Sequence, residues 1–161
     1  MTEREFIKRF GGIYENSPWV AEKAAPLVDG SADIDVIARV MVDCVDNASR
    51  EQQLALICAH PDLAGKAAIA GELTDDSRSE QASAGLDQCS PEEYARFQAL
   101  NRAYRRKFGF PFVMAVRDCS RAQILAAFES RLENDYDTEF ENALVEIHRI
   151  ARLRLVALGA N

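Results

Sequence analysis

The stretch Ser90–Gly109, SPEEYARFQALNRAYRRKFG, indicates the fold class because it carries every signal of a long helix. Ser90 and Glu93 have the spacing of a capping box, in which each side chain accepts from the other residue's backbone N–H group. Pro91 suits the first helical position, and Gly109 is a typical helix stop. An apolar stripe recurs between these signals at helical spacing: Tyr94, Phe97, Leu100, Tyr104 and Phe108.

Helix start signals recur along the rest of the chain, whereas strand signals are scarce. Ser17-Pro18 and Thr138 indicate two starts, and an apolar three-and-four repeat makes residues 33–47 an amphipathic helix. No repeat, linker or low-complexity stretch interrupts the series. We therefore expect an all-α fold of about eight helices in one compact domain, residues 1–161. The capping-box spacing recurs at three further pairs: Thr2 with Glu5, Ser49 with Gln52, and Ser120 with Gln123.

One segment departs from the helical pattern. Residues 108–116 read FGFPFVMAV, which is apolar, contains β-branched residues and is interrupted by a proline. Such a run favours an extended backbone, and no partner strand is evident elsewhere in the sequence. We expect the FGFPFV segment to be extended and to thread between helices.

Composition and charge narrow the class of partner. The net charge of −7 opposes binding to nucleic acid or to an anionic membrane surface. No apolar run approaches the roughly 18 residues that a membrane span needs. The charged N-terminal segment does not resemble a secretory signal, and the ending GAN is not a peroxisomal tripeptide. We expect a cytoplasmic protein whose partner is a small molecule.

The sequence carries no recognisable motif for a metal or a cofactor. With only two histidines, His60 and His148, a three-histidine zinc site is excluded. No glycine-rich phosphate loop, HExxH or GxSxG motif occurs. We expect no metal, no cofactor and free buried thiols. The four cysteines form no CxxC pair: Cys44, Cys58, Cys89 and Cys119.

The last helix places a cation among apolar residues. Arg154 falls on its core-facing side, where a guanidinium is rarely buried without a partner. The partner can be an internal carboxylate, a ligand anion or water. A structural role, with the guanidinium paired inside the protein or reaching water, is commoner than ligand binding. Arg149 and Arg152 fall on the opposite face. The stripe itself is formed by Phe140, Leu144, Ile147, Ala151 and Leu158.

Two other polar sites have both a structural and a functional interpretation. His60 precedes Pro61, which disfavours helical geometry, so it lies at a helix exit as a cap, a boundary residue or an acid–base group. Ser77 and Glu80 have capping-box spacing, and a helix beginning at Ser77 would also direct N–H groups towards an anion or carbonyl. His148 lies at the edge of its helix stripe and is given no role.

Four segments of the sequence form a distinctive series: HPDLAG at residues 60–65, SRSEQASAGL at 77–86, NRAYRRKFGFPFVMAV at 101–116 and IARLRL at 150–155. In this order and at these spacings they resemble the signature segments of the 2-oxo-4-hydroxy-4-carboxy-5-ureidoimidazoline (OHCU) decarboxylase family. The resemblance covers nearly the whole chain, and HPDLAG with FGFPFV is a distinctive combination.

The resemblance implies an all-α enzyme, usually a homodimer, that decarboxylates OHCU to (S)-allantoin and CO₂ at the end of urate breakdown, without metal or cofactor. His60 matches the family's proton donor, and we take Glu80 and Arg154 as the other catalytic candidates. On the residues alone, a non-catalytic helical module and a hydrolase of cyclic ureides stay open. The implied substrate contacts are Pro61, Ser77, Arg78, Ser79, Glu80, Gln81, Phe112, Val113, Met114, Ala115, Val116 and Arg154.

Overall fold

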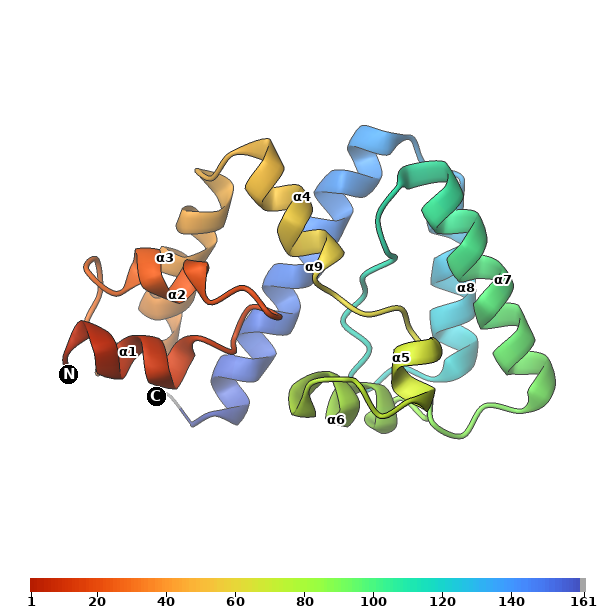
Figure 1. Cartoon of the computed structure of the whole chain (residues 1–161), viewed down its shortest axis with the longest axis horizontal. Helices are drawn as coiled ribbons and strands as arrows, with labels where there is room; N and C mark the ends of the chain where they lie inside the picture. Colours follow the sequence, from red (N-terminus) through yellow and green to blue (C-terminus); the bar gives the residue numbers. More distant parts are fainter. Residues whose placement is uncertain (160–161) are drawn as a thin grey trace. The chain divides into compact units, whose positions relative to one another are not determined.

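The computed structural model describes residues 1–159, and every regular element in that range is an α-helix (Figure 1). The all-α prediction of about eight helices is confirmed, with the four-residue α5 as an addition. The ending GAN lies largely outside the described residues. The helices are α1 (Glu3–Phe10), α2 (Trp19–Ala24), α3 (Ile34–Asp46), α4 (Arg50–Cys58), α5 (Lys66–Ile69), α6 (Asp75–Ser83), α7 (Pro91–Phe108), α8 (Arg121–Leu132) and α9 (Tyr136–Ala157).

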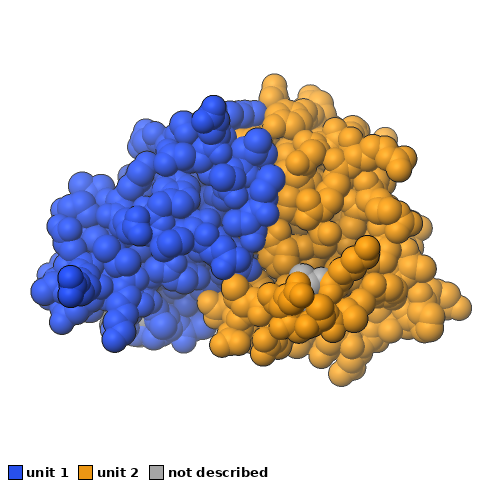
Figure 2. Space-filling view, viewed as in Figure 1, with its two compact units in different colours: residues 1–59, 147–161 blue, residues 60–146 orange. Residues whose placement is uncertain are grey.

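The chain divides into two compact units (Figure 2). Unit 1 comprises Met1–Ala59 and the described residues from Ile147 onward, and unit 2 comprises His60–Glu146. The boundary between the units therefore falls inside α9. The expectation of a single domain stays a prediction, which one cooperative unfolding transition would support.

In unit 1, α1 packs on α2 and α2 on α3. The capping boxes predicted at Thr2 and Ser49 are both formed. The predicted cap at Ser17 is wrong, because α2 begins at Trp19 and the Ser17 hydroxyl instead donates to the carbonyl of Glu15. Fully buried side chains of this unit include Phe6, Phe10, Val20, Ile37, Met41, Val45, Leu56 and Ile57.

In unit 2, α7 packs on α8 and has the predicted ends. Ser90 forms its capping box, and Gly109 ends it with a left-handed φ of 78°, which glycine adopts without strain. Two predicted helix caps are displaced by three residues towards the N-terminus. Thr74, not Ser77, caps α6, and α9 begins at Tyr136 with the Asp135 carboxylate accepting the N–H of Thr138.

The run FGFPFVMAV is non-helical from Pro111 to Val116 and is largely buried, as the sequence predicts. Its aromatic residues join the core of unit 2. The Phe112 ring stacks on Phe128, with centroids 3.9 Å apart and planes 9° apart, and Tyr104 meets Phe112 edge-on. Burying such large rings is the main stabilising contribution to this core.

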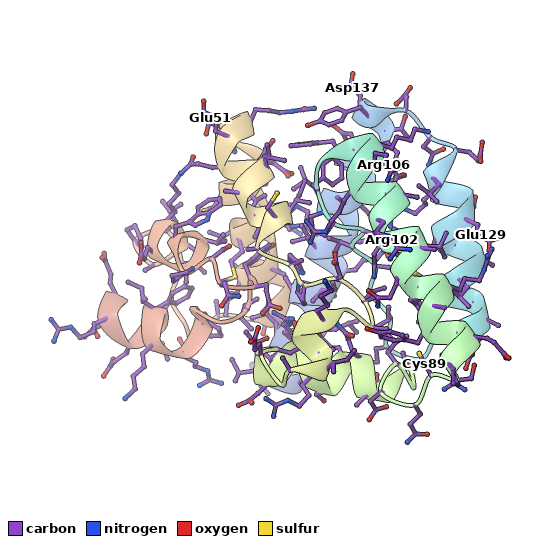
Figure 3. All side chains as sticks on the ribbon, turned by 45° about the vertical axis from the view of Figure 1, so that its right-hand side comes forward. Glu51, Cys89, Arg102, Arg106, Glu129 and Asp137 are labelled. Atoms are coloured by element: carbon purple, nitrogen blue, oxygen red, sulfur yellow. The ribbon has the colours of Figure 1, made fainter. Side chains whose placement is uncertain are left out.

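Charged side chains occupy the outer faces of unit 2, where Arg102 and Arg106 of α7 and Glu129 of α8 are exposed (Figure 3). Across residues 1–159, no helix is long and apolar enough to cross a membrane. The four cysteines are free, as expected, but the prediction that they are buried is wrong: three are half-buried, and Cys58 is exposed. Leu158, placed on the apolar stripe by periodicity, is also exposed, because it lies beyond the end of α9.

Candidate active site

His60 opens the loop His60–Gly65, which we call the HPDLAG loop. The residue before it, Ala59, is the C-cap of α4, and Pro61 follows it, so the helix exit predicted for His60 is confirmed. The imidazole is buried, with only 6% of the residue exposed. A buried titratable group at the head of a loop needs a rigid frame if it is to act on a substrate.

The first part of that frame is Gln81, on α6. Its side-chain oxygen accepts the N–H of Ala64 at 3.0 Å, and its nitrogen donates to the carbonyl of Asp62 at 3.2 Å. Gln81 is buried, and its amide thus bridges two peptide groups of the HPDLAG loop. This contact gives Gln81 a positioning role, and the substrate contact implied for it stays a prediction.

The second part of the frame comes from α7. Gln98 donates to the carbonyl of Ala64 at 2.6 Å, and Asn101 donates to the carbonyl of Leu63 at 3.0 Å. Arg105 reaches the Asp62 carboxylate at 2.9 Å. These three residues are not among the predicted site residues, although they recur at spacings of three and four on one flank of the apolar stripe.

We call Gln81, Gln98 and Asn101 the clamp on the HPDLAG loop, and these side chains hold an unusual backbone conformation. Ala64 has a φ of +51°, in the left-handed region that costs a residue with a Cβ roughly 1 kcal/mol or more. Both of its peptide groups are held, the N–H by Gln81 and the C=O by Gln98. At Gly65, an added Cβ would come within 2.8 Å of the Asp62 Cβ, so the tight turn requires glycine. The loop is therefore fixed by side chains rather than by its own propensity.

Residues 77–81 lie on α6. Ser77 and Gln81 are buried, Glu80 is half-buried, and Arg78 and Ser79 are exposed. The expectation that Ser77 begins the helix and offers N–H groups to an anion is wrong, because Ser77 N–H bonds the Thr74 hydroxyl and Arg78 N–H bonds the Thr74 carbonyl. Any binding role of Ser77 would therefore come from its hydroxyl.

The other site residues implied in unit 2 are Pro61, which is half-buried, and the run Phe112–Val116. Phe112, Val113 and Val116 are buried, whereas Met114 and Ala115 are half-buried. Unit 2 thus contains every implied site residue except Arg154.

Arg154 belongs to unit 1, where the apolar stripe buries it as predicted, with 3% of its side chain exposed. Its Nη1 lies 3.6 Å from Glu15 Oε1 and 3.4 and 3.5 Å from the carbonyl oxygens of Ile13 and Gly12. Of the partners that the sequence left open, an internal carboxylate is therefore present. A guanidinium has five N–H donors, so it can hold protein acceptors and a ligand together.

His148, on α9, also has defined partners within unit 1. Its Nδ1 lies 2.8 Å from the Tyr14 hydroxyl, and its Nε2 lies 3.3 Å from Asp46 Oδ1. Burial raises the pKa of Tyr14 well above its usual range, so the hydroxyl bonded to Nδ1 stays protonated. The chain Tyr14–His148–Asp46 ties the segment before α2 to α9 by side chains.

A cavity of about 410 Å³ lies in unit 2 beside the HPDLAG loop. It is mainly apolar, and Ala64, Leu73, Gln81, Leu86 and Tyr94 contribute to its wall. Of the implied site residues, Arg78 and Gln81 line this cavity, whereas His60 and the run Phe112–Val116 do not. Among residues 1–159, no cluster of three His, Cys, Asp or Glu side chains could hold a metal ion.

Comparison with known proteins agrees with these features. A family model described as OHCU decarboxylase matches residues 1–156. The chain is 48% identical over 155 residues to a protein of Haloferax volcanii named 2-oxo-4-hydroxy-4-carboxy-5-ureidoimidazoline decarboxylase, covering 96% of this chain and 89% of that one.

Two crystal structures have the same fold. One, of an (S)-allantoin synthase, has a TM-score of 0.76 and 32% identity, and the match covers 98% of this chain and 51% of that chain. The other, of an OHCU decarboxylase in the presence of (S)-allantoin, has a TM-score of 0.74 and 23% identity, covering 92% and 96%. The match to the family model spans almost the entire sequence, and the chain belongs to the OHCU decarboxylase family.

Proposed function

We propose that this chain converts OHCU to (S)-allantoin and CO₂, with His60 moving the proton. One observation carries the assignment of roles: His60 is buried at the head of a loop whose peptide groups are bonded by Gln81, Gln98 and Asn101. A general acid or base contributes most when its geometry is fixed before the substrate arrives.

The chemistry suits an enzyme that works with side chains alone. When the bond to the carboxylate breaks, CO₂ leaves and an electron pair stays behind, for which many decarboxylases supply a cofactor. In OHCU the carboxylated carbon adjoins a carbon–nitrogen double bond, which accepts the pair. The protein must then position the substrate, stabilise the developing charge and deliver one proton to carbon.

Each implied residue has a chemical task in this scheme. Arg154 holds an anionic or carbonyl group of the substrate with its planar fork. Glu80, half-buried on α6, accepts from the ureido or ring N–H groups, and Gln81 combines loop positioning with a contact of its own. His60 acts at the hydroxyl group of the decarboxylated carbon, which loses its proton as the carbonyl forms, and at the adjacent carbon of the former C=N bond, which takes a proton. Because the proton arrives from one side, a single enantiomer forms.

The test generates OHCU from urate in situ and follows allantoin by circular dichroism. Uncatalysed decay should give a racemate with no signal, so the enzyme should produce a growing signal of one sign as CO₂ is released. A hydrolase of cyclic ureides would consume the intermediate without releasing CO₂. A non-catalytic module would leave the racemate forming at the background rate, and either result rejects the proposal.

The homodimer implied by the resemblance and the cytoplasmic location stay expectations. Sedimentation velocity at several concentrations would test the first, since a stable dimer keeps twice the chain mass of 17.9 kDa on dilution.

A further inference from the structure

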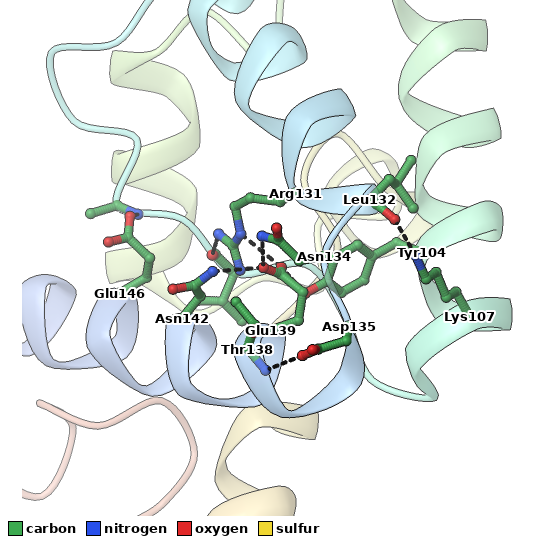
Figure 4. A network of polar contacts seen from close by, with 12 residues as sticks. Tyr104, Lys107, Arg131, Leu132, Asn134, Asp135, Thr138, Glu139, Asn142 and Glu146 are labelled. Atoms are coloured by element: carbon green, nitrogen blue, oxygen red, sulfur yellow. Dashed lines mark hydrogen bonds and ion pairs between the residues drawn. The ribbon is translucent and has the colours of Figure 1, made fainter.

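A buried polar network in unit 2 centres on Glu139, in the first turn of α9 (Figure 4). The side chain is 0% exposed. Burial raises the pKa of this carboxyl group, but hydrogen bonds and the charge of Arg131 outweigh it and lower the pKa below its usual value, so it is ionised at neutral pH. Its four donors are Tyr104 Oη at 2.6 Å, Arg131 Nε at 2.8 Å, Asn134 Nδ2 at 2.9 Å and Asn142 Nδ2 at 2.7 Å.

Arg131, on α8, connects this network to the run Phe112–Val116. While Nε pairs with Glu139, Nη1 donates to the carbonyl of Val113 at 2.6 Å. The guanidinium also lies over the Phe112 ring, 4.4 Å from its centroid. A planar fork can make all three contacts at once, whereas a point-like ammonium cannot.

A second side chain holds the same run. Glu146 Oε1, on α9, accepts the N–H of Ala115 at 3.2 Å. In an extended chain, peptide groups of alternate residues point to the same edge. The carbonyl of Val113 and the N–H of Ala115 therefore mark one edge, and the peptide groups of Met114 face the other. Within residues 1–159, no hydrogen bond reaches the N–H or C=O of Met114.

We propose that Arg131, oriented by Glu139, and Glu146 are positioning residues that fix the run so that Met114 presents its backbone N–H and C=O to the substrate. A cyclic urea or a ureido group offers an N–H and a C=O side by side, which complements such a pair. This inference rests on the proposed function, because it takes the run to be part of the substrate site.

The test compares two arginines of α8. Arg131→Lys keeps the charge beside Glu139 but should release the Val113 carbonyl. Arg121→Lys is the matched control, because Arg121 also pairs with a glutamate, Glu93, and donates to a loop carbonyl, that of Gly85. The melting temperature is measured for both variants, and kcat and KM for OHCU are then measured well below either melting temperature.

We expect Arg131→Lys to raise KM and lower kcat/KM by roughly tenfold to a hundredfold, the scale of a misplaced binding group, while Arg121→Lys stays within about twofold. If Arg131→Lys does not fold, two variants of Glu146 replace it. Glu146→Ala should raise KM, whereas Glu146→Gln, which keeps an acceptor oxygen, should have a KM close to that of the unaltered chain. Equal kcat/KM for the two arginine variants, or for the two Glu146 variants, overturns the inference while the proposed function stands. An unaltered chain with no activity overturns both.

Discussion

Arg154 and Glu15 form an ion pair in which both side chains are almost fully buried, 3% and 2% exposed, with 3.6 Å between Nη1 and Oε1. Removing either partner would leave a charge in a poorly solvated site, which typically costs about 3 to 5 kcal/mol. A substitution that removes the charge would therefore lower the stability of the fold as well as any substrate binding, and the two effects could not be separated. A test of Arg154 must keep its positive charge.

Arg154→Lys meets that condition, since the ammonium can still face Glu15 but loses the planar fork. If Arg154 grips the substrate, kcat/KM should fall by roughly ten- to a hundredfold, with little change in melting temperature. Arg152→Lys is the control on the same helix, because Arg152 is exposed and pairs with Asp35 at the surface. Equal kinetic effects at both positions, or a fall in melting temperature that accounts for the lost activity, would make Arg154 purely structural.

His60→Asn should slow OHCU decarboxylation by roughly a hundredfold or more, the usual contribution of a general acid or base, because the amide can bond but cannot transfer the proton. The remaining product should lean towards the racemate that forms without the enzyme. Steady-state rates and circular dichroism of the product measure both effects. His148→Asn, at the other histidine, should keep the rate within about tenfold of the unaltered chain, well short of the loss from an acid–base residue.

The sequence predicts a helix start correctly where a capping-box pair stands directly before a clear apolar repeat. The capping boxes of Thr2, Ser49, Ser90 and Ser120 all form, because each precedes a clear apolar repeat. Before α6, Thr74 and Ser77 are both suitable cap residues, and Thr74 forms the cap. The helix therefore begins at Asp75, and two acidic residues in its first turn interact favourably with the positive end of the helix dipole.

Contacts between distant residues could not be predicted from periodicity. The pattern of the last helix correctly buried Arg154, yet nothing in it indicated Glu15 as the partner. The clamp on the HPDLAG loop could not be predicted either, because Gln98 and Asn101 look like ordinary polar residues beside an apolar stripe in the sequence. Only the folded structure shows that they contact the loop. The network of Arg131 and Glu139 depends on the turn between α8 and α9, which no sequence motif marked.

Exhaustive dialysis against a chelator should leave kcat and KM unchanged, because the proposed chemistry uses only side chains and the substrate's own electron sink. The measurement compares initial rates before and after treatment, with metal analysis of the dialysed protein. Loss of activity that Zn²⁺ or Mg²⁺ restores would show that a metal takes part and would contradict the proposed mechanism.

The contact of His148 with Tyr14 and Asp46 predicts a specific dependence of stability on pH. Burial lowers the pKa of His148 below its usual 6.5, and the hydrogen bond to Asp46 offsets only part of that effect. Below pH 6.5 the unfolded chain therefore binds a proton at this position more readily than the folded chain, and the free energy of unfolding falls. The contribution of His148 is complete above pH 6.5 and is lost as the pH falls through the lowered pKa.

His148→Gln should remove this dependence, because an amide does not titrate in that range. The difference in melting temperature between the unaltered chain and the variant should therefore shrink as the pH falls from 7.5 towards 5, by about 2–4 °C for each kcal/mol lost in a chain of this size. Subtracting the two curves cancels the carboxylates that titrate lower, such as Glu139 and Glu93, whose pKa values also lie below the usual range. A difference that stays constant or grows on acidification would mean that the folded state stabilises the charged imidazole, with Asp46 rather than burial dominating.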